Sequence, residues 1–195
     1  MKNKNILPNR QTLTCPPVPT YGKHFIAIFR HMCYITSNER DETSVTKILF
    51  VCHGNICRSP MAEYVMKDIV KKAGMEAEFE IASAATSYEE QGSPAYPPVR
   101  RLLSAKGIDA SAHRARKLTS SDIEHYDMLI GMDKANLRSM QRMYGNSPKI
   151  SLLLDHTDRP GEVDDPWYSG DFSQTWKDVT LGCTSLFANL TTKHY

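Results

Sequence analysis

The sequence lacks three features that would point directly to a protein class: an excess of one charge, a cysteine framework and a long apolar run. Its 24 Lys and Arg against 22 Asp and Glu leave a formal net charge of +2, which gives little attraction to nucleic acid or an anionic membrane. The five cysteines form an odd, scattered set without the spacing typical of disulfides or of a zinc site. The apolar run at 24–29 is too short to cross a bilayer and lacks a cleavage pattern.

These absences favour a cytoplasmic protein with reduced thiols, and we expect neither nucleic acid nor a membrane among its partners. We also expect no metal and no cofactor. The first 45 residues differ from the rest, because they hold four of the eleven prolines and end in a polar run. We therefore expect residues 1–45 to be a disordered N-terminal extension, and a read-through upstream of the natural start is the alternative. Residues 46–195 suffice for one domain with a substantial core.

Within that domain, short apolar runs alternate with segments of helical periodicity. The first run, "KILFVC", is continuous, as expected of a strand buried on both faces of a parallel sheet. The alternation predicts an α/β fold, an open four-stranded parallel sheet with helices on both faces, doubly wound and Rossmann-like. Ligands of such folds bind beyond the carboxyl ends of the strands. Strands are predicted at 47–52, 78–83, 127–132 and 149–154, and helices at 60–74, 94–107, 120–126, 133–145 and from about 171.

The first strand leads directly into "VCHGNICRSP", residues 51–60, at a predicted helix start. Gly54 and Asn55 tolerate the left-handed conformations by which a loop turns several N–H groups toward one point. The start of the helix adds positive potential there, with Ser59 expected as the N-cap before Pro60. Arg58 adds a planar fork that suits two phosphate oxygens. The loop is therefore predicted to bind a phosphate dianion.

The same surroundings would activate Cys52. A free thiol titrates at about 8.5, and a helix N-terminus or a nearby cation lowers this to roughly 3.5–7.5. Cys52 is then expected to be largely thiolate and to attack phosphorus, giving a phosphocysteine, while Ser59 donates a hydrogen bond to the sulfur. Two other interpretations are a buried core cysteine and a bare phosphate-binding loop. The loop lacks the Gly-Lys-Ser/Thr of the Walker pattern.

This loop resembles the signature of the low-molecular-weight protein tyrosine phosphatases, in which five residues separate a cysteine from an arginine followed by serine. Other segments resemble the family in the family's order: "SAATS" at 83–87, "AHRARKL" at 112–118, "YDMLIGMD" at 126–133 and "DDPWY" at 164–168. The resemblance implies hydrolysis of protein phosphotyrosine, and it identifies residues 46–195 as the phosphatase domain.

A phenolate leaving group needs a proton as its P–O bond breaks, so an acid is expected over the loop. The resemblance implies that Asp165, directly before a proline, donates this proton and then activates water, with Asp164 as the competitor. Trp167 and Tyr168 are expected to grip the aromatic ring, although the family usually has two tyrosines there.

The resemblance also implies supporting roles. Asn55 is expected to be held by Ser83 and His113, and Cys57 to pair with the nucleophile under oxidation. His53, often leucine in relatives, and Tyr88 are further pocket candidates. The predicted catalytic residues are Cys52, Arg58 and Asp165, and the predicted substrate-binding residues are His53, Gly54, Asn55, Ile56, Cys57, Ser59, Trp167 and Tyr168.

Three alternatives remain beside the phosphotyrosine phosphatase. The branch that hydrolyses phosphoarginine typically has threonine where this chain has Ile56. Arsenate reduction needs further reactive cysteines near 120–135, and the sequence has none between Cys57 and Cys183. A binding module without catalysis should lack the acid loop. The expected partners are phosphotyrosine-containing proteins and a tyrosine kinase, and the expected state is a monomer or weak dimer.

Overall fold

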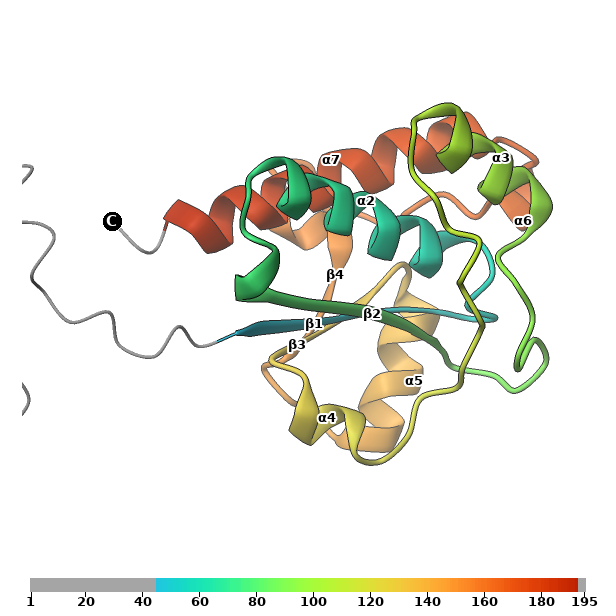
Figure 1. Ribbon diagram of the computed structural model, residues 1–195. Coiled ribbons are helices and arrows are strands. Elements are labelled where there is room, and N and C mark those ends of the chain that lie inside the picture. The colour runs from blue at the N-terminus through green and yellow to red at the C-terminus, as the bar shows by residue number, and fades with distance from the viewer. Residues whose placement is uncertain (1–44, 193–195) are drawn as a thin grey trace, which may run out of the picture. The chain divides into compact units, whose positions relative to one another are not determined.

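The structure, a computed structural model, describes residues 45–192. The predicted extension at 1–45 therefore lies outside the described residues, apart from Val45. Four parallel strands form one sheet in the order β2-β1-β3-β4 (Figure 1). Their bounds are β1 Thr46–Cys52, β2 Phe79–Ala85, β3 Met128–Gly131 and β4 Ile150–Leu152. The predicted fold class is confirmed.

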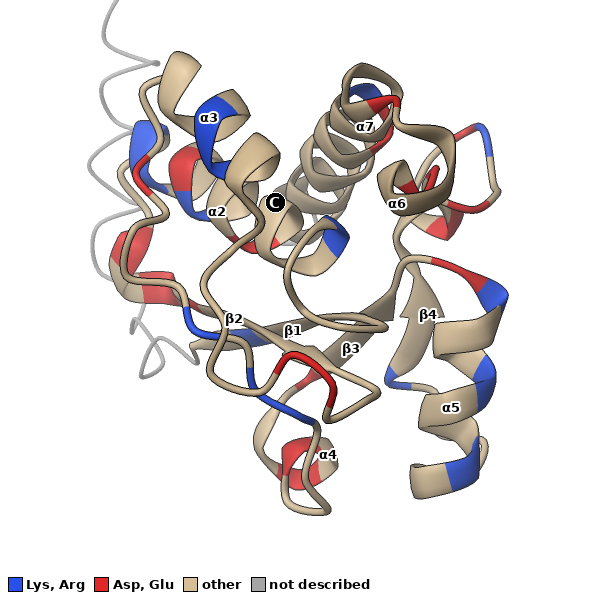
Figure 2. Ribbon diagram, turned by 90° about the vertical axis from the view of Figure 1, so that its right-hand side faces the viewer, with Lys and Arg blue, Asp and Glu red and all other residues tan. Residues whose placement is uncertain are grey.

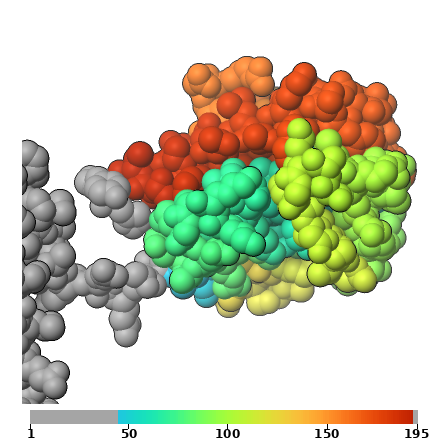
Figure 3. Space-filling view, turned by 45° about the horizontal axis from the view of Figure 1, so that its top comes forward, coloured from blue at the N-terminus to red at the C-terminus, as the bar shows by residue number. Residues whose placement is uncertain are grey.

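Helices cover both faces of this sheet, as Figure 1 shows. One face carries α2 (Arg58–Lys72), α3 (Pro97–Ala105) and α7 (Phe172–Thr191), and the other carries α4 (Asp122–His125) and α5 (Lys134–Tyr144). The helices α2 and α7 pack against each other and lie side by side at the surface in Figure 3. Three short elements complete the described part of the chain: η2 (Glu76–Glu78), η3 (Leu153–His156) and α6 (Pro166–Ser169).

The position of β1 explains its apolar sequence. It is an inner strand, and its side chains alternate between the two faces. Ile48 and Phe50 belong to the core under α2 and α7, whereas Leu49 and Val51 belong to the core on the opposite face, and all four are fully buried. The same alternation turns Cys52 toward the α2 side, at the carboxyl end of the sheet.

Two local predictions were wrong. Ser59 is not the N-cap of α2, because the helix begins two residues earlier than predicted, at Arg58 with Cys57 at the N-cap position, and the Ser59 hydroxyl lies against Cys52 instead. The strand predicted at 149–154 ends at Leu152, because Leu153 and Leu154 turn into η3 and are buried.

A glycine in the middle of α7 permits the closest approach between this helix and η3. Gly182 is buried, and a Cβ atom placed on it would lie 2.4 Å from Cγ of Leu153. Real side chains do not tolerate that distance, so the backbone of α7 can only sit here without a side chain at this position.

We predict that Gly182→Ala destabilises the protein by about 1–3 kcal/mol through overpacking. The sign is informative, because glycine to alanine within an exposed helix stabilises by about 1 kcal/mol. Thermal unfolding followed by circular dichroism measures the difference. Thr184→Ala, at an exposed position of the same helix, is the matched control and should not lower the melting temperature. A Gly182→Ala protein as stable as the control would contradict the close packing.

Candidate active site

The loop between β1 and α2, residues 52–58, is shaped by one buried asparagine. Asn55 has a φ of 57°, a left-handed conformation that is unusual outside glycine. Its side-chain Nδ2 donates to Oγ of Ser83 at 2.7 Å and to Oγ of Ser59 at 2.9 Å, and its Oδ1 accepts from the Arg116 amide at 3.1 Å. Its carbonyl lies 2.8 Å from Nε2 of His113. Asn55 thus makes the contacts with Ser83 and His113 that the resemblance implies.

A carboxylate that the sequence reasoning missed lies behind this network. Glu63, in the second turn of α2, is buried and accepts from Oγ of Ser83 at 2.5 Å. It also pairs with Lys67 one turn later, and Nδ1 of His113 lies 3.9 Å from it. The only signal in the sequence is an acid within the apolar face of a predicted helix. Glu63 orients Ser83, so that its hydroxyl oxygen is free to accept from Asn55.

Two cysteines face the same loop, and their surroundings differ. Sγ of Cys52 lies 3.0 Å from Oγ of Ser59 and accepts from the backbone N–H of Asn55 at 3.3 Å. Burial, followed by the charges of Cys52 and Asp165, raises the pKa of Cys57 to about 12. Cys57 is therefore a neutral thiol at neutral pH. Both cysteines are free in the structure, and the disulfide between them stays a prediction.

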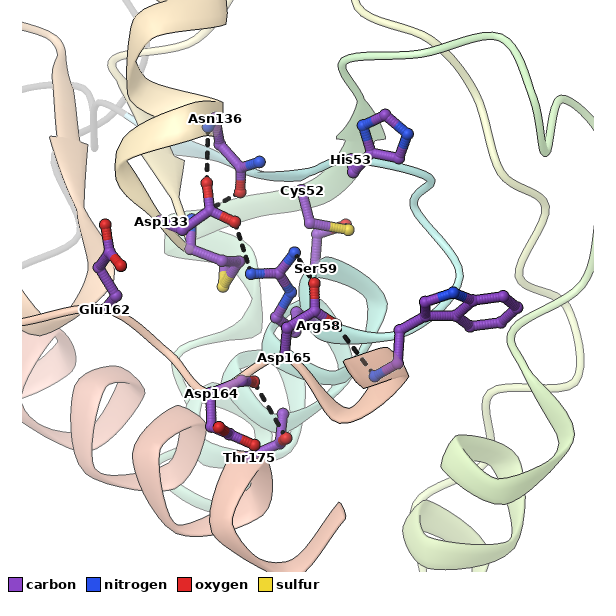
Figure 4. Close-up of polar contacts among 12 residues, drawn as sticks. Cys52, His53, Arg58, Ser59, Asp133, Asn136, Glu162, Asp164, Asp165 and Thr175 are labelled. Carbon is purple, nitrogen blue, oxygen red and sulfur yellow. Dashed lines mark hydrogen bonds and ion pairs between the residues drawn. The ribbon is translucent and has the colours of Figure 1, made fainter. Parts of the chain in front are cut away.

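Arg58 is buried and pairs with two carboxylates (Figure 4). Its Nη1 lies 2.6 Å from Oδ2 of Asp133, and its Nη2 lies 2.5 Å from Oδ2 of Asp165. Although burial lowers the pKa of Arg58, the charges of Cys52 and the two aspartates raise it overall. Its Nε is buried and has no hydrogen-bond partner among the described residues, so one donor of the guanidinium is left for a ligand.

Asp133 is a second residue that the sequence reasoning did not assign to the site. It follows β3 and caps α5 through Oδ1, which accepts from the Asn136 amide at 2.7 Å. Because β3 pairs with β1, their carboxyl ends bring Asp133 beside Arg58. An aspartate between a strand and a helix was the available signal, and strand order was needed to interpret it.

The two adjacent aspartates before Pro166 point in different directions. Asp165 caps α6, where Oδ1 accepts from the Trp167 amide at 3.1 Å while Oδ2 contacts Arg58. Asp164 accepts from Oγ of Ser169 at 2.6 Å, and Figure 4 shows its backbone contact with Thr175 of α7. Of the two carboxylates, only that of Asp165 reaches the loop at residues 52–58. This loop is called the phosphate loop, after the ligand that its sequence predicts.

These side chains surround a cavity of about 210 Å³. Of the predicted site residues, Asn55, Ser59, Ser83 and His113 are buried and do not line it, nor does Tyr88, which is exposed. The cavity is lined by Cys52, His53, Gly54, Ile56, Cys57, Arg58, Asp165, Trp167, Tyr168 and two residues that the sequence reasoning missed, Glu89 and Glu90.

Two aromatic side chains form the outer side of the cavity. Trp167 and Tyr168 are both exposed, at 61% and 87%. The ring of Trp167 is held edge-on by Tyr96, with centroids 5.7 Å apart, and Tyr96 stacks on Phe172 at 6.1 Å. This packing fixes Trp167 next to the cavity, whereas Tyr168 projects into solvent.

Within residues 45–192, no group of three or more His, Cys, Asp or Glu is placed to hold a metal ion. No helix in the same part of the chain has the length and apolar character needed to cross a membrane.

Comparison with known proteins finds relatives and solved structures that are similar to this chain. The low molecular weight protein-tyrosine-phosphatase YfkJ of Bacillus subtilis is 35% identical over 147 residues, covering 73% of this chain and 94% of the relative. Its crystal structure superimposes with a TM-score of 0.76 and 33% identity, covering 80% of this chain and all of that one. The low molecular weight phosphotyrosine protein phosphatase of Schizosaccharomyces pombe is 42% identical over 134 residues, covering 66% of this chain and 85% of the relative.

A solved Drosophila arginine phosphatase is also similar, with 26% identity, a TM-score of 0.68 and coverage of 74% of this chain and 98% of that one. The family model described as low molecular weight phosphotyrosine protein phosphatase matches residues 47–195. With its parallel sheet, its cysteine loop and these matches, the chain belongs to the low molecular weight phosphotyrosine protein phosphatase family.

Proposed function

We propose that this protein hydrolyses phosphotyrosine in proteins through a phosphocysteine on Cys52. The observation that carries the proposal is a single cavity onto which Cys52 and Arg58, from the two ends of one loop, and Asp165, from the segment before α6, converge. A nucleophile, a cation for the phosphoryl oxygens and an acid for the leaving group are the parts that such a reaction needs. Family membership supports the same assignment.

In the first step, the Cys52 thiolate forms a bond to phosphorus while the bond from phosphorus to the tyrosyl oxygen breaks. Asp165 in its acid form gives its proton to that oxygen, so tyrosine leaves as a neutral phenol. In the second step, the Asp165 carboxylate takes a proton from a water molecule that attacks phosphorus. Inorganic phosphate is released and the Cys52 thiolate is restored, with Ser59 stabilising the sulfur by its contact at 3.0 Å.

Substrate binding requires an exchange of partners at Arg58. In the free protein its Nη2 is paired with Asp165, which must release it when phosphate oxygens arrive. The pair with Asp133 does not face the cavity and holds the guanidinium in place meanwhile. The released Asp165 is then free to turn toward the leaving oxygen, and the unpartnered Nε of Arg58 gains an acceptor.

Ile56 bears on the phosphoarginine alternative, which the similarity to a Drosophila arginine phosphatase also raises. Ile56 lines the cavity with the aromatic side chain of Trp167. Ile56 offers an apolar surface and Trp167 an aromatic one, against which a phenyl ring can pack, and we take these two surfaces to favour phosphotyrosine. We further propose residues 46–195 as the catalytic domain of a cytoplasmic monomer or weak dimer, with a tyrosine kinase as partner.

We predict that Cys52→Ser loses at least about 10³-fold in kcat, because a serine hydroxyl is a far weaker nucleophile. Initial rates on a phosphotyrosyl peptide measure the loss, and calorimetric titration with inorganic phosphate should still show binding. Cys183→Ser is the control, since this buried thiol lies outside the cavity and contacts the carbonyl of Ala62. Turnover by Cys52→Ser comparable to that of the control would rule out the phosphocysteine.

We predict that Asp165→Asn loses about 10²–10⁴-fold in kcat on a phosphotyrosyl peptide, the range usual for a general acid. The loss should be smaller on para-nitrophenyl phosphate, whose leaving group needs little protonation. Asp164→Asn is the matched control, because its carboxylate faces Ser169 and not the cavity. Equal losses on both substrates, or an equal effect of Asp164→Asn, would contradict the assignment of the acid.

A further inference from the structure

Two consecutive glutamates at the mouth of the cavity have no part in the mechanism above. Glu89 and Glu90, called here the rim carboxylates, both line the cavity. Their loop follows β2 and is fastened to the phosphate loop, because the Thr86 amide donates to the carbonyl of Cys52 at 2.9 Å and the Ser87 amide to that of His53 at 3.1 Å. The start of the loop that carries the rim carboxylates is therefore held beside Cys52.

His53 holds the first of them in place. Its Nε2 lies 3.0 Å from Oε2 of Glu89, and the backbone N–H of Glu89 donates to Oγ of Ser87 at 3.1 Å. Both side chains of this pair are mainly exposed, and both residues line the cavity. His53 thus acts as a positioning residue for Glu89, in addition to bordering the cavity itself.

Glu90 is held by packing and carries an uncompensated charge. Its Cγ lies so close to Gly54 that a Cβ atom on this glycine would approach it to 3.3 Å. The side chain is half-buried, yet among residues 45–192 it has no ion-pair or hydrogen-bond partner. Its charge reaches the phosphate loop, where, after burial, it is among the charges that raise the pKa of Cys57. Because no cation among the described residues pairs with it, this carboxylate is available to a cationic group of a ligand.

Of the residues that line the cavity, His53 contacts Glu89, and Arg58 is the remaining basic side chain. Arg58 already faces Asp133 and Asp165, and phosphate replaces the second of these when it binds. Outside the phosphate position, the fixed charges of the mouth are those of Glu89 and Glu90, and acidic stretches are visible in the loops at this end of the sheet in Figure 2. When the phosphate of a substrate is bound, the residues next to its phosphotyrosine lie close to the negative charges of Glu89 and Glu90.

We propose that the rim carboxylates Glu89 and Glu90 select phosphotyrosines that are flanked by lysine or arginine and disfavour those flanked by acidic residues. Neighbouring Cα atoms are only 3.80 Å apart, so the long side chain of an adjacent Lys or Arg reaches the mouth while the phosphate occupies the loop. Like-charge contacts at such a rim discourage wrong partners. The inference rests on the proposed function and specifies the substrate class of the same site.

The test compares two phosphotyrosyl peptides that are identical except for Lys or Glu immediately before and after the phosphotyrosine. We expect the wild-type kcat/KM to be roughly tenfold higher for the Lys peptide at low ionic strength, and this ratio to fall as salt screens the rim. Glu90→Gln and Glu89→Gln should each lower the ratio by about threefold, and the double variant should bring it close to one. Because a ratio is measured within one enzyme, a general loss of activity cancels.

Glu124→Gln provides the matched control, since this exposed glutamate of α4 does not line the cavity and loses the same charge. Its ratio should equal that of the wild type. His53→Gln should lower the ratio as Glu89→Gln does, because it frees Glu89 from its place. An unchanged ratio in the double variant, or a wild-type ratio near one, would overturn the proposal that Glu89 and Glu90 select basic flanking residues.

A substrate without flanking residues separates this result from a failure of the proposed function. If wild-type enzyme hydrolyses para-nitrophenyl phosphate and both peptides, but without preference, only the inference on the rim is wrong. If it hydrolyses none of the three, the proposed phosphatase activity itself is wrong. A preference for the Glu peptide would show that other groups decide the specificity, and it would overturn the inference as well.

Discussion

The site depends on the hydrogen bonds that hold Asn55 in a left-handed conformation. Such a backbone costs about 1–3 kcal/mol outside glycine, and it persists only when its surroundings determine it. Here Ser83, Ser59 and the Arg116 amide bind the side chain while His113 binds the carbonyl. Each buried bond contributes about 0.5–1.5 kcal/mol, enough together to offset the strain. These contacts with Asn55 thus maintain the curvature of the loop, which brings Cys52 and Arg58 to the same cavity.

The charge of Arg58 is balanced by two aspartates, and this balance determines what an anion must displace when it enters the cavity. A buried guanidinium without an anion would be costly, and in the free protein Asp133 and Asp165 provide two. Only Asp165 lies on the cavity, so an incoming phosphate competes with one aspartate and leaves the other in place. The residue displaced is the one that we propose as the acid. In the proposed reaction, binding of the substrate and release of the acid are therefore one event.

Features encoded by neighbouring residues were predictable, and features that depend on strand order were not. The apolar run of β1, the spacing from Cys52 to Arg58 and the aspartates before Pro166 are local patterns, and they led to the fold and the loop. Glu63 and Asp133 enter the site through tertiary packing, which no spacing reveals. The N-cap at Ser59 failed for a related reason, since its hydroxyl faces the sulfur of Cys52 rather than the helix end.

The electrostatic effects of the phosphate loop and of the rim carboxylates extend over different distances. One cavity can therefore act both on a bound anion and on groups that are still approaching. Backbone N–H dipoles, such as that of Asn55 toward the sulfur, weaken quickly with distance and act on the anion already bound. The charges of Glu89 and Glu90 extend over roughly a Debye length, about 8–10 Å in moderate salt, and act on groups that are still approaching. In the proposed reaction, stabilisation of the transition state therefore falls largely to the loop. The proposed selectivity of the rim falls on the residues that accompany the phosphate, where substrates differ from one another.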